Sequence, residues 1–202
     1  DKPRSHECAY ATFDPKTNRW SKWKMLAMPD SGTKFFLTAP GCVQWLVENN
    51  GSLLIPLYYR GPNGDDYSTT VVRASFDGET MKYIEHGDEM SQVGGRGLCE
   101  PSLVEYSGKY YLTIRNDARG YVATSSDGLH FEPRKEWTFD DGKELGSYNT
   151  QQHWLAHSSG FFLCYTRRGA NNDHIARNRA PLFIARVDPK KLQVIRSTEQ
   201  VL

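Results

Sequence analysis

Residues 99–131, CEPSLVEYSGKYYLTIRNDARGYVATSSDGLHF, contain the hairpin around which we expect the chain to be organised. Two runs rich in β-forming residues, 101–106 and 109–114, flank Ser107-Gly108, a pair typical of a tight two-residue turn. With that turn, Glu100 lies opposite Arg115 at the open end, and cross-strand partners are about 5 Å apart at Cβ. The hairpin therefore presents either an ordinary cross-strand ion pair or a catalytic acid/base beside an anion clamp.

A short turn motif recurs along the chain. The pattern Ala-x-x-Asp followed by Pro or Gly occurs at Asp14, Asp77 and Asp188, and one residue longer at Asp127. A run of β-forming residues precedes each Asp, and an aspartate carboxylate can accept hydrogen bonds from the backbone N–H groups just ahead of it. We predict that each Asp forms the turn between two outer strands.

A second repeated unit lies upstream of three of these turns. It runs from a turn glycine through an apolar strand to an arginine, at 51–60, 108–115 and 160–167. A further strand is predicted before each unit, in CVQWLVENN, CEPSLVEYS and QQHWLAHSS. Four strands in meander order make a propeller blade, so we predict an all-β protein, a β-propeller of four-stranded antiparallel blades.

The repeats predict a single domain over residues 1–202. A partial blade at 1–40 is followed by full blades at about 41–93, 98–140 and 150–202. A ring with this content would leave unpaired strand edges exposed. We therefore expect a segment of a larger propeller, six- or seven-bladed when complete, with the remainder of the propeller chain as its partner.

The composition excludes several classes of function. Hydrophobic residues make up 38% of the chain and aromatic residues 12%, and no apolar run approaches the ~20 residues of a membrane span. No targeting segment is recognisable. The net charge of +1 argues against nucleic acid as a partner. We expect no membrane span and no cofactor.

Two stretches resemble successive blades of the sialidase (neuraminidase) superfamily. They are GCVQWLVENNGSLLIPLYYR and CEPSLVEYSGKYYLTIRND, the latter followed by GYVATSSDGLHF, and the Asp turns resemble that family's Asp-boxes. The resemblance implies that Glu100 matches the Glu that activates a tyrosine nucleophile. It further implies that Arg115 and Arg179 match the second and third members of an arginine triad. The family's first triad arginine, its acid/base Asp and its nucleophilic Tyr would lie outside the given sequence.

The resemblance implies an exo-glycosidase that removes a terminal carboxylate-bearing sugar, such as sialic acid, from glycans. Planar guanidinium groups bind carboxylates bidentately, and sialidases use a Tyr nucleophile in place of a second carboxylate. A secreted or periplasmic location is favoured by the same resemblance. One alternative is a propeller polysaccharide lyase or α-rhamnosidase acting on uronate-containing polysaccharide, and another is a non-catalytic glycan-binding propeller.

Further candidates follow from blade geometry. The start of an inner strand and the end of the second strand lie at one face, where the mouth of a site would be. Polar and charged residues expected at this face are Arg60, Arg115, Asn116, Asp117, Arg119, Gln152, His153, Arg167 and Arg168. The connection 169–180 is longer than a tight hairpin needs. From it we predict Asn171, Asp173, His174 and Arg179 as substrate contacts, with a solvated loop as the alternative.

His153 and His157 have the spacing of a helical zinc motif. The segment is instead predicted to be a strand, in which four residues span about 13 Å, so we expect no metal site. His153 by itself is the second catalytic candidate, as a general base in a lyase or rhamnosidase. Its alternative role is stacking or hydrogen bonding at the end of the blade.

The sequence also predicts the state of the four cysteines and the location of two tryptophans. Cys8, Cys42, Cys99 and Cys164 lack Cys-x-x-Cys spacing. We predict buried free thiols, with a bridge between Cys42 and Cys99 as the alternative. Trp20 and Trp23 follow the first Asp turn, so we expect outer-strand rings packed between blades.

Overall fold

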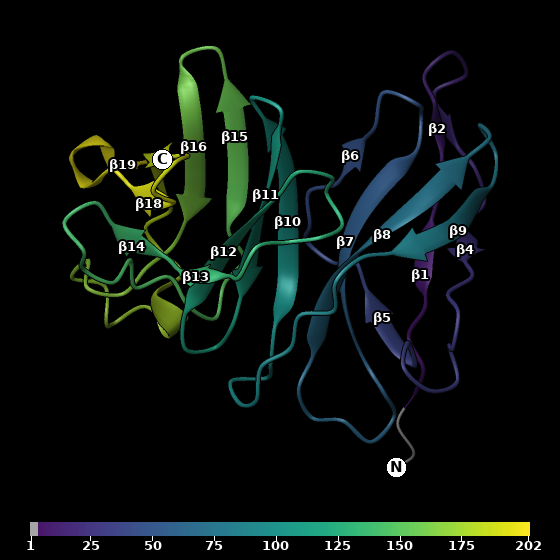
Figure 1. Ribbon diagram of the computed structural model, residues 1–202, viewed down its shortest axis with the longest axis horizontal. Coiled ribbons are helices and arrows are strands. Elements are labelled where there is room, and N and C mark those ends of the chain that lie inside the picture. The colour runs from purple at the N-terminus through teal and green to yellow at the C-terminus, as the bar shows by residue number, and fades with distance from the viewer. Residues whose placement is uncertain (1–3) are drawn as a thin grey trace.

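In the computed structural model, residues 4–202 are described, and they fold into antiparallel β-sheets joined by turns and loops. Figure 1 shows the sheets side by side in chain order, from the N-terminal sheet on the right to the C-terminal sheet on the left. Within these residues the helical segments are two short 3₁₀ turns, η1 (Ala176–Asn178) and η2 (Arg196–Thr198). No helix in this range is long and apolar enough to cross a membrane. The predicted all-β class, with antiparallel sheets of about four strands, is confirmed.

The N-terminal residues form two small strand pairs. β1 (Cys8–Tyr10) pairs with β4 (Lys24–Leu26), and β2 (Phe13–Asp14) pairs with β3 (Arg19–Trp20). Trp20 and Trp23 are 70% and 71% exposed. The prediction that these rings pack between blades is wrong for residues 4–202, because the β2–β3 hairpin lies at the outer end of the molecule (Figure 1).

The second sheet has the order β5-β7-β8-β9, and β6 also pairs with β7. Its strands are β5 (Leu37–Ala39), β6 (Leu46–Val47), β7 (Leu53–Arg60), β8 (Ser68–Phe76) and β9 (Met81–His86). The side chains of β7 are buried along most of its length. A strand covered on both faces is expected to have such a continuous apolar run.

The central sheet contains the hairpin predicted from residues 99–131. Its strands are β10 (Cys99–Tyr106), β11 (Lys109–Arg115), β12 (Gly120–Ser125) and β13 (Lys135–Glu136), paired in that order. Ser107 and Gly108 have φ angles of 52° and 74°, and the positive values are those of a type I′ hairpin turn. The turn prediction is confirmed.

The C-terminal sheet has the order β14-β18-β17-β16-β15, and β19 also pairs with β17. Its strands are β14 (Thr138–Phe139), β15 (His153–His157), β16 (Gly160–Tyr165), β17 (Phe183–Asp188), β18 (Gln193–Val194) and β19 (Gln200–Val201). β14 precedes this sheet in the chain and pairs with β18 in parallel. That pairing ties the outer edge of the C-terminal sheet to the segment that leaves the central sheet.

The four repeated aspartates make the turns that the sequence predicts. Each carboxylate accepts hydrogen bonds from backbone N–H groups two or three residues ahead. Asp127 also accepts a hydrogen bond from Ser125 Oγ at 2.9 Å. The repeated Asp therefore stabilises each turn through hydrogen bonds between its carboxylate and the backbone of the same turn.

Apolar side chains fill the spaces between neighbouring sheets. Phe161 stacks on both Tyr106 and Trp154, with ring centroids 4.6 and 4.7 Å apart. This joins the central sheet to the C-terminal one. Leu54 from β7 and Leu103 from β10 belong to another cluster, which joins the central sheet to the second sheet. Each such side chain contributes about 1.5–3 kcal/mol when fully buried, so the sheets are held in a defined relative position.

All four cysteines are free, as predicted, but they do not share one environment. Cys8 and Cys99 are buried, and burial raises the pKa of Cys8 to about 12 and that of Cys99 to about 11. Cys42 is exposed, so the prediction of buried thiols is wrong there. It lies between β5 and β6 with φ of 57°, where the strand is interrupted and the chain leaves the core.

Candidate functional site

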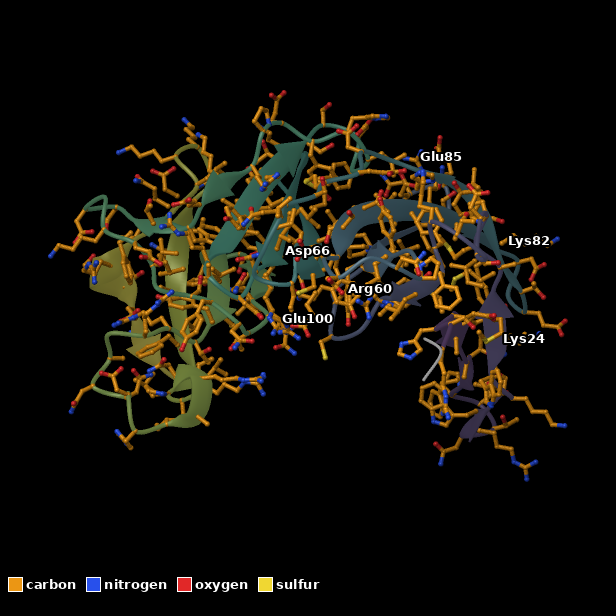
Figure 2. All side chains as sticks on the ribbon, turned by 90° about the horizontal axis from the view of Figure 1, so that it is seen from below. Lys24, Arg60, Asp66, Lys82, Glu85 and Glu100 are labelled. Carbon is orange, nitrogen blue, oxygen red and sulfur yellow. The ribbon has the colours of Figure 1, made fainter. Side chains whose placement is uncertain are left out.

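The candidate site lies where β10 and β15 begin and where β7 and β11 end. β10 packs against both β7 and β15, so side chains from three sheets meet at this edge. Figure 2 views this side of the molecule and shows Arg60, Asp66 and Glu100 in the middle of the view.

Glu100 lies on a β-bulge at the start of β10. The hairpin register is as predicted from Ser102 onward, but Cys99, not Glu100, is the partner of Arg115. Glu100 has φ of 47°, a left-handed conformation that is uncommon for a residue with a side chain. The predicted pairing of Glu100 with Arg115 is thus wrong in register, because the bulge inserts an extra residue. Their side chains still meet, since Glu100 Oε2 accepts a hydrogen bond from Arg115 Nη1 at 2.5 Å.

Arg115 is the most buried charged group of the site. Its side chain is 5% exposed, compared with 17% for Glu100. Its Nη2 donates to Asn149 Oδ1 at 2.5 Å and to Asp117 Oδ1 at 3.2 Å. Both terminal nitrogens therefore have acceptors within the protein. The predicted anion clamp is instead a group that holds Glu100 in place.

A second arginine completes this network. Arg96 donates from Nε and Nη2 to the two carboxylate oxygens of Asp117 at 2.7 and 2.8 Å, and from Nη2 to Asn149 Oδ1 at 3.3 Å. The hydrogen-bonded Arg96 guanidinium holds the pKa of Asp117 below its usual value, although partial burial opposes this. With Glu100 and Asp117 ionised, two carboxylates balance two guanidinium groups. The network carries no excess positive charge.

Tyr58, at the end of β7, contributes a phenol near Glu100. Burial raises its pKa to about 12, and the negative charge of Glu100 adds to the effect. The phenol therefore keeps its proton at neutral pH and can donate a hydrogen bond to a ligand. Its ring meets Tyr67 edge to face, with centroids 5.0 Å apart. Sequence reasoning missed Arg96 and Asn149 because they belong to no repeated motif, and it missed Tyr58 because the repeated unit at 51–60 was interpreted only as an apolar strand ending in an arginine.

His153, at the start of β15, lies close enough to Glu100 to feel its charge. Its Nδ1 is 3.4 Å from Ser102 Oγ. Burial lowers the pKa of His153, while the nearby Glu100 carboxylate opposes this shift. The imidazole is therefore neutral at pH 7, the form that a general base requires. The structure brings both predicted catalytic residues, Glu100 and His153, into one neighbourhood.

Three of the predicted substrate contacts are committed to holding the fold. The Asn116 side chain is fully buried and donates to the carbonyl oxygens of Gly94, Gly95 and Gly97. Gln152 is 1% exposed and bonds Thr113 and Thr150. Arg167 forms an ion pair with Glu199 at 2.6 Å. These partners leave the three side chains little capacity to bind a sugar, which sequence position alone did not reveal.

The remaining predicted contacts stay accessible. Arg60 is partly exposed, and the residues predicted from the long connection are all exposed, namely Asn171, Asp173, His174 and Arg179. The connection itself is organised by two buried asparagines that the sequence did not single out, Asn172 and Asn178, which hydrogen-bond each other. It joins β16 to β17 at the lower end of the C-terminal sheet in Figure 1, the end at which β10 and β15 begin. Substrate contact by these residues stays a prediction.

Two predicted arginines at the rim have partners on their own surface. Arg119 pairs with Glu136, and Arg168 donates to the carbonyl oxygen of Ala118 at 2.7 Å. No group of three or more His, Cys, Asp and Glu side chains suited to a metal ion occurs within residues 4–202. The segment containing His153 and His157 is strand β15, as predicted.

The site combines side chains that can bind sugars with side chains that can transfer protons. It contains a partly exposed carboxylate held by a buried guanidinium, a protonated phenol and a neutral imidazole, at the edge where three sheets meet. Such groups can bind a polyhydroxylated ligand and move a proton at neutral pH.

Comparison with solved structures connects this fold to propeller glycosidases. The chain is similar to a Trypanosoma rangeli sialidase solved in complex with sialic acid, with 20% identity over 89% of this chain and 30% of that one, and a TM-score of 0.57. It is also similar to a Bombyx mori GH32 β-fructofuranosidase, with 13% identity over 89% of this chain and 40% of that one, and a TM-score of 0.54. A GH43 enzyme from Xanthomonas citri matches with 13% identity over 79% of this chain and 54% of that one, and a TM-score of 0.51.

These likenesses show the fold alone. No protein-family model matches the chain, and no curated protein matches it in sequence. The chain spans between 30% and 54% of the length of the three structures. The protein therefore has the fold of part of a propeller glycosidase, and the similarity extends across sialidases and the GH43 and GH32 enzymes.

Proposed function

We propose that the chain forms part of a glycoside hydrolase that cleaves a terminal carboxylate-bearing sugar from glycans. The observation that carries this proposal is the position of Glu100, a partly exposed carboxylate held at 2.5 Å by the buried Arg115. The contact with Arg115 fixes the orientation of Glu100, and part of its carboxylate stays open to a ligand. In our proposal this oriented carboxylate accepts a proton during the reaction.

The sialidase resemblance gives Glu100 a specific partner in this proposal. Glu100 takes the proton from a tyrosine nucleophile supplied by a part of the propeller outside residues 1–202. The tyrosine oxygen then attacks the anomeric carbon while the glycosidic bond breaks, and the leaving aglycone oxygen takes a proton from the acid/base Asp, also outside these residues. The bulge that carries Glu100 aims its side chain differently from a regular strand position. Arg115 acts here as a positioning residue, because its contacts hold Glu100 and Asp117 in place.

The substitution Glu100→Gln tests this role in the full-length protein. Gln keeps the shape and an acceptor for Arg115 but loses the basic carboxylate, so we expect turnover of an acidic glycoside to fall by about 10²–10⁴-fold. Ligand affinity should stay within a few fold. The matched control is Glu105→Gln, an exposed position on the same strand. Unchanged turnover in the Glu100 variant rejects the proposal, whereas binding without any turnover in the unsubstituted protein supports a non-catalytic glycan-binding propeller.

A second candidate function is favoured by the neutral imidazole of His153. In a polysaccharide lyase or an α-rhamnosidase acting on uronate-containing polysaccharide, His153 would be the general base. We expect His153→Gln to abolish such activity and Glu100→Gln to reduce it less. A lyase forms an unsaturated uronate product that absorbs in the ultraviolet, so product spectroscopy separates a lyase from a hydrolase, and release of free rhamnose identifies an α-rhamnosidase. A hydrolase with full activity after His153→Gln rules out the second candidate.

A further inference from the structure

A pocket of about 250 Å³ opens between the N-terminal segment and the end of β7. Its volume is slightly below the roughly 300–1,000 Å³ typical of small-molecule sites. Its lining includes three basic residues, Arg4, His6 and Arg60, together with the aromatic residues Phe36 and Tyr67. This pocket lies outside the Glu100 network described above.

The charges around the pocket are not balanced. Among residues 4–202, no acidic side chain lines the pocket, and none of its three basic side chains forms an ion pair with an acidic one. The neighbouring Glu7 lines a different pocket. Asp66 accepts a hydrogen bond from the backbone N–H of Gly94 at 2.9 Å. The pocket therefore carries the excess positive charge that the Arg115 network lacks.

Arg60 is held in position by its surroundings. Its guanidinium lies over the ring of Tyr67, with Cζ 5.0 Å from the centroid. Nη1 donates a hydrogen bond to the carbonyl oxygen of Gly64 at 2.6 Å. Within residues 4–202, Nε and Nη2 of Arg60 have no hydrogen-bond acceptor, so both can donate to a bound anion. Such an arginine loses little conformational entropy when it binds an anion.

The opposite wall of the pocket is also fixed by backbone contacts. His6 donates its backbone N–H to Phe36, and its carbonyl oxygen accepts the N–H of Thr38, at 3.1 and 3.0 Å. These bonds attach the N-terminal segment to β5. The segment that carries Arg4 and His6 is therefore attached to the edge of the second sheet at His6.

A row of aromatic side chains connects this pocket to the site. Tyr67 meets Tyr58 at 5.0 Å between ring centroids, and Tyr58 lies close enough to Glu100 for the carboxylate to raise its pKa. The pocket and Glu100 are thus separated by about two aromatic side chains. A single oligosaccharide that occupies both places would extend past Tyr67 and Tyr58.

We propose that the pocket lined by Arg4, His6 and Arg60 is an anion-binding subsite for a charged substituent, carboxylate or sulfate, on a sugar adjoining the one at Glu100. The substrate would then be an acidic oligosaccharide with more than one negative charge. This extension rests on the proposed function, but the binding of an anion to the pocket does not. The two are therefore tested separately.

Nuclear magnetic resonance titration of the full-length protein tests the subsite directly. Inorganic sulfate, galacturonic acid and trigalacturonate serve as charged probes, and methyl galactoside serves as the neutral one. We expect saturable shifts of the His6, Arg60 and Tyr67 resonances with sulfate and with both uronates, and tighter binding of the trimer than of the monomer. The neutral sugar should not shift these resonances.

Substitutions then assign the effect to the pocket. Arg4→Gln and Arg60→Gln should each weaken binding by about 10-fold or more, the loss expected when a charge-assisted hydrogen bond is removed. Arg134→Gln is the matched control, an arginine outside the pocket that likewise has no ion pair in residues 4–202. Arg4 is exposed, so Arg4→Gln leaves the fold intact and keeps the test valid if Arg60→Gln lowers stability.

The outcomes separate the subsite from the enzyme. The absence of saturable shifts with sulfate, or shifts that both substitutions leave unchanged, overturns the subsite. Binding of sulfate without binding of either uronate overturns its assignment to an acidic glycan. Anion binding that persists in Glu100→Gln while turnover is lost supports both proposals, and anion binding in a protein without turnover leaves the subsite standing while the hydrolase proposal fails.

Discussion

The substitution Arg115→Met is expected to destabilise the protein by about 3 kcal/mol. Arg115 is 5% exposed and holds two carboxylates, Glu100 and Asp117, which are themselves 17% and 28% exposed. Removing one partner of a buried ion pair costs about 3–5 kcal/mol, because the other charge is left without compensation. The lower end applies here, since water reaches both carboxylates and Asp117 retains Arg96. Met preserves part of the packing of the arginine stem.

Denaturant unfolding of the full-length protein measures this loss. The matched control is Arg119→Met, from the same hairpin, whose ion pair with Glu136 is 47% exposed on both sides. Such a surface pair contributes about 0–1 kcal/mol. If Arg115→Met costs less than about 1 kcal/mol, or no more than the control, then Arg115 does not anchor the network and our account of how Glu100 is positioned is refuted.

A double-substitution cycle isolates the contact between Arg115 and Glu100 within this prediction. Glu100→Gln removes the charge that Arg115 compensates, so the loss in the Arg115→Met, Glu100→Gln double variant should be smaller than the sum of the single losses. We expect a coupling free energy of about 1–2 kcal/mol, within the usual range for contacting residues. Additive effects would show that the two side chains act independently.

Two further predictions concern the surroundings of the site. Burial lowers the pKa of His153 in the folded state. The contribution of neutral His153 to the free energy of unfolding should therefore be fully present above the unfolded-state pKa of about 6.5, and should be lost as the pH falls below it. Unfolding experiments between about pH 7.5 and 5.5 should show a smaller decrease in His153→Gln, and equal slopes would contradict the shift. Gly97→Ala should cost about 2–4 kcal/mol, because φ is 72° and the new Cβ would lie 2.1 Å from the Tyr67 carbonyl oxygen. The control Gly142→Ala has φ of 81° but no atom within 4 Å, and should cost about 1 kcal/mol; equal losses would show that the close approach at Gly97 has no energetic effect.

The sequence was sufficient for features that depend on local chemistry. The Asp turns follow from a carboxylate that reaches the next backbone N–H groups, and the Ser107-Gly108 turn follows from residues that accept positive φ. The apolar run at 51–60 likewise predicted a strand, which is β7. These signals involve neighbours within a few residues, so their spacing alone was enough to predict all-β architecture and meander order.

The features decided by the tertiary structure depend on contacts between segments far apart in the chain. The bulge at Glu100 shifted the register by one residue, and no local pattern marks it. Asn149 reaches Arg115 across 34 positions in the chain, and Asn116 and Gln152, predicted to bind substrate, are buried in contacts with the backbone and neighbouring strands. The sequence thus determined which strands form and how they turn. Only the packing of one sheet against the next decided which charged groups are neutralised within the protein and which, at the Arg60 pocket, have no ion-pair partner among residues 4–202.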